Sequence, residues 1–164
     1  MGTTIFSGNH WGMAYGFINY ALTPGQNYYL HVVATNLDFQ SHGYFVDAGF
    51  LGSFSLSDAG FSFANGTQTL VTNTTDWTVS ASRGFWEVPA ETPVGDRTNG
   101  AAPWGQHLGI DSNATWIWHS SNNTQVAYFS TMITAAVPEP SSYALLLAGM
   151  GILGFAASRK KPAN

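Results

Sequence analysis

The chain has 164 residues, of which 15% are aromatic and only 9% are charged, and it contains no cysteine. This composition excludes a disordered chain and a long coiled coil, both of which need many charged side chains. The lack of cysteine excludes disulfides, thiolate metal sites and cysteine nucleophiles. Residues 1–136 carry eight acidic side chains and two arginines, a net charge of −6, so a nucleic-acid partner is also excluded.

The first residues do not look like a secretory leader. Met1 to Phe6 lack a basic region, and polar Ser7, Gly8 and Asn9 follow before an apolar stretch of about 7–15 residues can form. Because the sequence here already looks like a folded domain, we expect the natural start of the protein to lie upstream of Met1.

Short strands separated by turn-forming residues account for most of residues 1–136, and no segment there has a convincing helical period. In the segment 28–35 the side chains alternate, with Tyr28 and Leu30 on one face and Tyr29, His31 and Val33 on the other. The predicted strands are 28–35, 44–56, 61–63, 69–72, 77–80, 85–88, 115–118 and 125–133. The segment 44–56 is expected to be one long strand or a bent pair, with a bulge or kink at Gly49 and Gly52.

Two connections carry turn signals. Asn65-Gly66 predicts a hairpin turn. The stretch 89–106 holds three prolines and three glycines and predicts a long loop. Eight short strands with such turns predict an all-β, antiparallel jelly-roll or related sandwich over residues 1–136, which resembles the galactose-binding-like sandwiches of extracellular proteins in outline only.

The body shows no catalytic pattern. No two of its histidines have the spacing that places two imidazoles on one metal ion; the five are His10, His31, His42, His107 and His119. Glu87 and Glu91 are separated by a proline, and Asp76, Asp96 and Asp111 lie in turn contexts that favour side-chain to backbone bonds. We therefore expect no enzyme, no catalytic metal and no cofactor. The alternatives are a structural Ca²⁺ on loop carboxylates, a metal site assembled across strands, and a glycan hydrolase or lyase.

The tryptophans are the remaining residues that could indicate a ligand-binding site. Trp86 and Trp104 are candidates for glycan binding, because an exposed indole is a platform for a sugar ring, although either could instead anchor a loop. Trp116 and Trp118 share a strand face and are expected to fill the core.

The end of the chain has a different character. From Val137 it reads VPEPSSYALLLAGMGILGFAASRKKPAN, an extended Pro-Glu-Pro box, an apolar run and a basic cluster. The run Tyr143–Ala157 would form a helix of about 22 Å, which is short but usable for a bilayer of about 30 Å, and Arg159, Lys160 and Lys161 would then stop transfer and stay cytoplasmic. A C-terminal core helix is the alternative.

These three parts, Val137-Pro138-Glu139-Pro140, a short apolar helix and a terminal basic cluster, resemble the PEP-CTERM sorting signal of Gram-negative bacteria. The resemblance covers residues 137–161. It implies that an exosortase-type membrane transpeptidase recognises Val137, Pro138, Glu139 and Pro140 and processes the tail. It also implies association with exopolysaccharide or biofilm matrix.

The sequence thus predicts four parts: an extracytoplasmic sandwich at 1–136, a sorting box at 137–142, a transmembrane helix at 143–158 and a basic cytoplasmic tail at 159–164. The expected protein is a non-catalytic precursor anchored in the inner membrane and then passed to the cell surface or outside. Membrane lipid and, by the resemblance, the exosortase and exopolysaccharide are its expected partners. The alternative is a carbohydrate-binding module that acts through Trp86 and Trp104.

Overall fold

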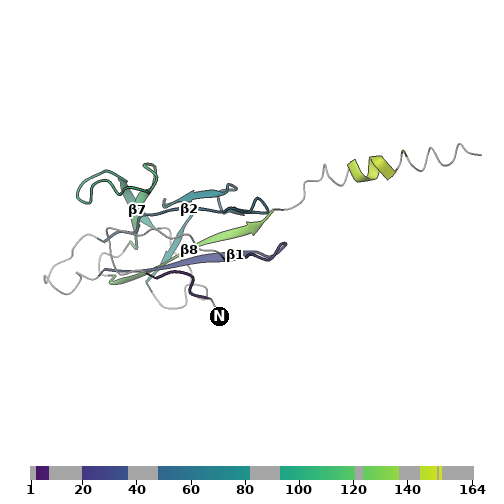
Figure 1. Ribbon diagram of the computed structural model, residues 1–164. Helices are drawn as coiled ribbons and strands as arrows, with labels where there is room; N and C mark the ends of the chain where they lie inside the picture. The colour runs from purple at the N-terminus through teal and green to yellow at the C-terminus, as the bar shows by residue number, and fades with distance from the viewer. Residues whose placement is uncertain are drawn as a thin grey trace, which may run out of the picture.

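In a computed structural model, the described part of the body consists of eight strands and their connections (Figure 1). The structure describes residues 3–7, 20–36, 48–81, 93–120, 124–136, 145–150 and 152. The strands are β1 (Tyr28–Thr35), β2 (Ser53–Ser55), β3 (Phe61–Phe63), β4 (Thr69–Val71), β5 (Thr78–Ser80), β6 (Val94–Thr98), β7 (Thr115–Trp118) and β8 (Val126–Ala135).

Strand β8 is the centre of the larger, four-stranded sheet. Its ten residues pair with β1 along one edge, from Thr35 opposite Val126 to Tyr28 opposite Ile133. Two short strands share the other edge, because β5 pairs with residues 128–130 and β3 with residues 133–135. All these pairings are antiparallel, and none of the four strands contains a charged residue.

A second layer covers one face of this sheet. It consists of the pairs β2–β4 and β6–β7, which are joined by a bridge between Phe50 and Ile117 and by a 2.8 Å hydrogen bond from the Thr115 amide to the Thr72 carbonyl. Figure 1 shows β2 and β7 above β1 and β8. The described strands therefore form a two-layered, sandwich-like body.

The core lies between the layers and is dominated by aromatic side chains. Trp77 is 1% exposed and donates its indole N–H to the Val71 carbonyl at 3.1 Å, so its polar atom is satisfied inside the core. Phe129 of β8 is fully buried, with ring centroids 5.0 Å from Phe50 and 5.9 Å from Trp118. The buried apolar cluster comprises Phe61, Phe63, Leu70, Trp77, Val79, Ile117, Trp118, Ala127, Phe129 and Ile133.

The all-β prediction is confirmed, and the strands at 28–35 and 115–118 have the predicted bounds. The strand predicted at 125–133 extends over 126–135, and within 44–56 the structure describes β2 and the bridge at Phe50. The strand predicted at 85–88, like Trp86, lies outside the described residues.

Two predictions about connections are wrong. The predicted loop 89–106 contains β6, whose five residues are all exposed and so show no apolar alternation; it is a strand because it pairs with β7. The turn at Asn65-Gly66 forms, with the Phe63 amide bonded to the Thr67 carbonyl at 2.8 Å, but β3 then pairs with β8 and β4 with β2. The turn thus connects the two layers instead of closing a hairpin within one sheet.

Of the predicted transmembrane helix at 143–158, the structure describes residues 145–150 and 152, which are helical. No helix in the described part of the chain is long and apolar enough to cross a bilayer. The prediction of a membrane-spanning helix is therefore not supported by these residues.

Replacing Phe129 by alanine should lower the free energy of unfolding by about 3–5 kcal/mol, because a fully buried ring is lost from between the layers. The matched change Val33→Ala, at a side chain that is 57% exposed on β1, should cost less than about 0.5 kcal/mol. Urea unfolding followed by tryptophan fluorescence measures both values. Equal losses in the two variants would contradict the described core.

Candidate functional site

The tail leaves the body from a fixed point at the end of β8. The Ala135 amide donates to the Asn27 side-chain oxygen at 3.1 Å, and the Ala136 amide donates to the Gly60 carbonyl at 2.7 Å. The predicted sorting box begins at the next residue. The chain is thus held by the folded body up to the residue that precedes Val137.

The predicted sorting residues themselves lie outside the described residues. This holds for Val137, Pro138, Glu139 and Pro140 and for the basic cluster Arg159, Lys160 and Lys161. Between them, the described helical residues expose large apolar side chains; Leu145, Leu146, Leu147, Met150 and Ile152 are 62–74% exposed. Figure 1 shows this helical turn apart from the strands.

A buried asparagine shapes the loop that carries Trp104. Asn99 is 8% exposed, and its side-chain nitrogen donates to the carbonyls of His107 at 3.0 Å and Ile110 at 2.9 Å. Its side-chain oxygen accepts the His107 amide at 2.8 Å. One amide side chain therefore ties together both ends of the loop that follows β6.

Trp104 is half-buried and packs against Trp116, with ring centroids 4.6 Å apart. His107 meets Trp116 edge-on at 5.2 Å. The absence of a side chain at Gly49 makes room for these rings, since a Cβ atom there would lie 2.7 Å from the Trp116 ring. Trp116 and Trp118 are both buried, as predicted, although Trp118 lies in the main core and Trp116 in this separate aromatic cluster.

The described carboxylates are engaged locally. The Asp111 carboxylate accepts the Asn113 amide at 2.8 Å, and Asp76 accepts the Asn73 side-chain amide at 2.8 Å. Asp96 forms an exposed ion pair with Arg97 at 3.8 Å. Over the described ranges, no three acidic or histidine side chains are grouped as a metal site would require. Glu87, Glu91, His10 and His42 lie outside the described residues.

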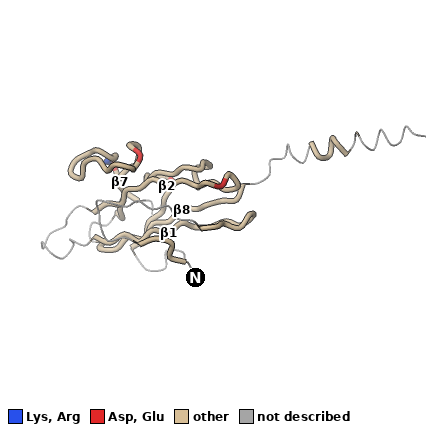
Figure 2. Tube along the Cα trace, in the orientation of Figure 1, with Lys and Arg blue, Asp and Glu red and all other residues tan. Residues whose placement is uncertain are grey.

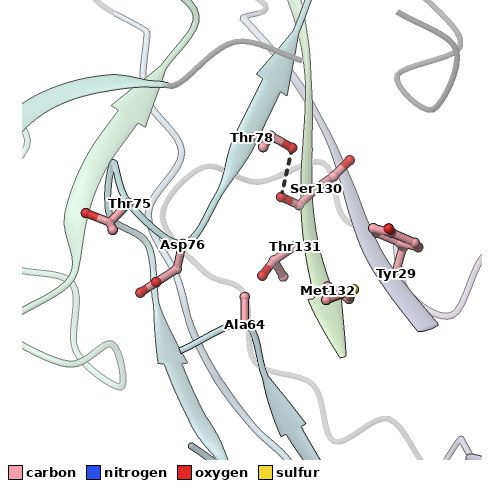
Figure 3. Close-up of a pocket in the computed structure, with 8 residues that line it drawn as sticks. All are labelled: Tyr29, Ala64, Thr75, Asp76, Thr78, Ser130, Thr131 and Met132. Atoms are coloured by element: carbon pink, nitrogen blue, oxygen red, sulfur yellow. Dashed lines mark hydrogen bonds between the residues drawn. The ribbon is translucent and has the colours of Figure 1, made fainter. Parts of the chain in front are cut away.

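A recess opens beside β8 where this strand changes partners (Figure 3). Ser130 is the last residue opposite β5 and Ile133 is the first opposite β3, so Thr131 and Met132 lie between the two short strands. The recess has a volume of about 290 Å³ and is lined by Tyr29, Ala64, Thr75, Asp76, Thr78, Ser130, Thr131 and Met132. No sequence pattern predicts this recess, because it depends on how two distant short strands share one edge of β8.

Tyr29, which lines the recess, lies beside His31 on the outer face of β1. Their rings stack, with centroids 5.8 Å apart and planes inclined by 8°, and the His31 Nδ1 lies 2.8 Å from the Ser130 hydroxyl. Burial lowers the pKa of His31, because the charged imidazolium is poorly solvated there.

Comparison with known proteins supports one part of the chain. A family model described as the PEP-CTERM protein-sorting motif matches residues 136–160. The chain therefore carries this sorting motif directly after β8, which confirms the predicted signal and leaves the body unmatched. A comparison with curated proteins found no match, and a comparison with solved structures found none either.

The depressed pKa of His31 predicts that its contribution to stability declines as the pH falls through about 6.5, where the unfolded chain begins to take up a proton that the folded chain resists. Above this pH both states hold neutral imidazole and the contribution is constant. Urea unfolding between pH 8 and pH 5 should show a smaller pH dependence in His31→Gln than in the natural chain. Identical profiles would contradict the described environment of His31.

The variant Asn99→Asp should have a free energy of unfolding lower by about 2–3 kcal/mol. Its carboxylate can still accept the His107 amide, but it has no N–H group to donate to the carbonyls of His107 and Ile110. The control Asn113→Asp changes an exposed residue of the same region and should have little effect. Urea unfolding measures both, and a change in Trp104 emission should accompany the first variant only.

Proposed function

We propose that this chain is a non-catalytic component of the cell surface or extracellular matrix, associated with exopolysaccharide. The sorting motif implies an exported protein that is processed by an exosortase, a membrane enzyme. The observation that carries the proposal is the motif at residues 136–160, whose first residue, Ala136, is bonded to the body through its amide.

The precursor would be held in the inner membrane before processing. In this proposal the segment 143–158 inserts into lipid, and Arg159, Lys160 and Lys161 remain on the cytoplasmic side. The exposure of Leu145, Leu147 and Ile152 supports it, because a cluster of exposed apolar side chains indicates a lipid or protein partner. The body, residues 1–136, would then lie outside the cytoplasm as a sandwich of the jelly-roll or galactose-binding-like kind.

Binding rather than catalysis is proposed for the body because its described carboxylates are occupied in turns. Asp58 and Asp111 accept backbone amides two residues further on, at 2.8 Å each. The charges of the described trace are few, and none lies within a strand of the larger sheet (Figure 2). Such a surface suits an uncharged polysaccharide better than an ionic partner.

Recognition of a glycan through Trp86 and Trp104 is the second candidate. The Trp104 indole is half-buried, because it packs against Trp116. A sugar ring could therefore contact only the exposed part of this indole. The cluster of Trp104, Trp116 and His107 would have to form the binding surface together.

Processing of the tail tests the proposed function. The full chain, fused behind a secretory leader, should yield a product shortened at its C-terminus in a host with an exosortase, and only the full-length form in the same host without that enzyme. The double variant Pro138→Ala with Glu139→Ala should stay full length in both hosts. The control Pro162→Ala lies beyond the matched residues and should be processed normally. Mass spectrometry of envelope and matrix fractions gives the readout, and an unshortened natural chain in the first host would refute the proposal.

A further inference from the structure

Strand β1 lies at one edge of the larger sheet, beside β8 (Figure 1). It pairs with β8 along one side over all eight of its residues, and no other described strand pairs with its opposite side. The unpaired side of a strand presents a row of backbone N–H and C=O groups to which another extended chain can bond. We call this side of β1 the open edge.

The other strands at the edges of the described sheets have features that oppose such pairing. Strands β2, β3, β4 and β5 contain only three residues each. Strand β6 carries Asp96 and Arg97, and its register with β7 shifts between Val94 and Arg97. Short length, charged side chains and bulges are common means by which edge strands avoid association. Strand β1 has none of them, because its eight residues include no charged residue and no proline and pair with β8 in unbroken register.

The register defines which backbone groups point to the open edge. The Asn36 amide donates to the Gln125 carbonyl at 2.8 Å, directly after the last pair of β1 and β8. Because hydrogen-bonded pairs alternate with non-hydrogen-bonded pairs in an antiparallel ladder, the even-numbered residues of β1 bond to β8. The N–H and C=O groups of Tyr29, Val33 and Thr35 therefore point away from β8, toward the open edge.

The surface beside the open edge is partly apolar and carries no charge. Tyr29 is 63% exposed and Val33 is 57% exposed, on the face of β1 opposite to Leu30 and Val32, which pack against the core. The segment 20–36 contains no lysine, arginine or acidic residue, although residues 1–136 have a net charge of −6. Two such acidic bodies repel each other least where the contact itself is uncharged.

The open edge is complementary to itself. A second β1 that is turned by a two-fold rotation runs antiparallel to the first and presents the same donors and acceptors to it. The outward-pointing residues of the two strands would then lie opposite one another, and Tyr29 and Val33 of both copies would share one face of the joined sheet. Aromatic and β-branched side chains that meet across antiparallel strands stabilise the pairing.

We propose that two copies of this chain associate through the open edge of β1, antiparallel and around a two-fold axis, so that their larger sheets become one continuous sheet. The inference goes beyond the proposed function, because it depends on neither the sorting motif nor a polysaccharide. It gives a chain without cysteine a contact between copies that needs no disulfide.

Sedimentation velocity of the full chain in a density-matched detergent tests the association. Pairing along one strand with a small apolar contact should be weak, with a Kd of about 10–100 µM. The protein mass should therefore rise from one copy to two between about 1 µM and about 1 mM.

Hydrogen exchange identifies the surface that associates. In a dilute sample the amides of Tyr29, Val33 and Thr35 should exchange rapidly, whereas those of Leu30 and Val32, which bond to β8, should exchange slowly. In a concentrated sample the first three amides should become protected as well. Association through the apolar tail would leave these three amides unprotected.

Variants separate the open edge from the rest of the surface. Val33→Lys should weaken the association at least tenfold, because each copy would bring a positive charge to the joined edges. The side chain is exposed, so the unfolding midpoint of the dilute protein should not change. Tyr29→Lys repeats the test at a second position. The matched control Val94→Lys changes a valine that is 48% exposed on the charged edge strand β6 and should associate like the natural chain.

Three results would overturn the proposal. The first is a single copy at every concentration. The second is slow exchange of the Tyr29 and Val33 amides in the dilute sample, which would show that one chain covers its own edge. The third is equal association of the natural chain, Val33→Lys and Tyr29→Lys, which would assign the contact to the tail or to another surface. Processing of the tail is measured separately, so a processed chain that stays a single copy would keep the proposed function and lose this inference.

Discussion

The structure depends on the backbone pairing of β8 along both of its edges. Because β1 covers one edge and β3 and β5 share the other, the backbone of this strand is satisfied while its side chains are buried between two layers. Its inward residues Ala127, Phe129 and Ile133 belong to the core cluster. A charged residue at any of these positions would be costly, and none occurs in the strand.

The recess and the start of the sorting motif both lie along β8 or at its end. The recess exists because two short strands cannot cover one long edge completely, which leaves Thr131 and Met132 between them. The sorting motif begins where β8 ends, with the Ala136 amide still bonded to Gly60. The tail that carries the motif therefore leaves the body from a strand that is paired along both of its edges.

Charged side chains are few in the body and absent from the apolar run of the tail. The strands of the larger sheet present hydroxyl, aromatic and aliphatic groups, and the described charges lie in β6 and in turns. In the proposed function, contacts with lipid through the apolar tail and with a neutral polysaccharide would need no ionic attraction. Both would be insensitive to salt, unlike those of a basic nucleic-acid-binding protein.

The sequence by itself determined the local features: the strands 28–35 and 115–118, the alternation that places Tyr29 and His31 together, and the sorting motif, which is read from consecutive residues. Only the tertiary structure decided that β6 is a strand, that β3 and β4 separate into different layers, and that Trp104 packs on Trp116. The reason is physical. Alternation and turn chemistry act over a few residues, whereas sheet partners and the recess around Thr131 are set by contacts between segments up to about a hundred residues apart, such as Asn27 and Ala135.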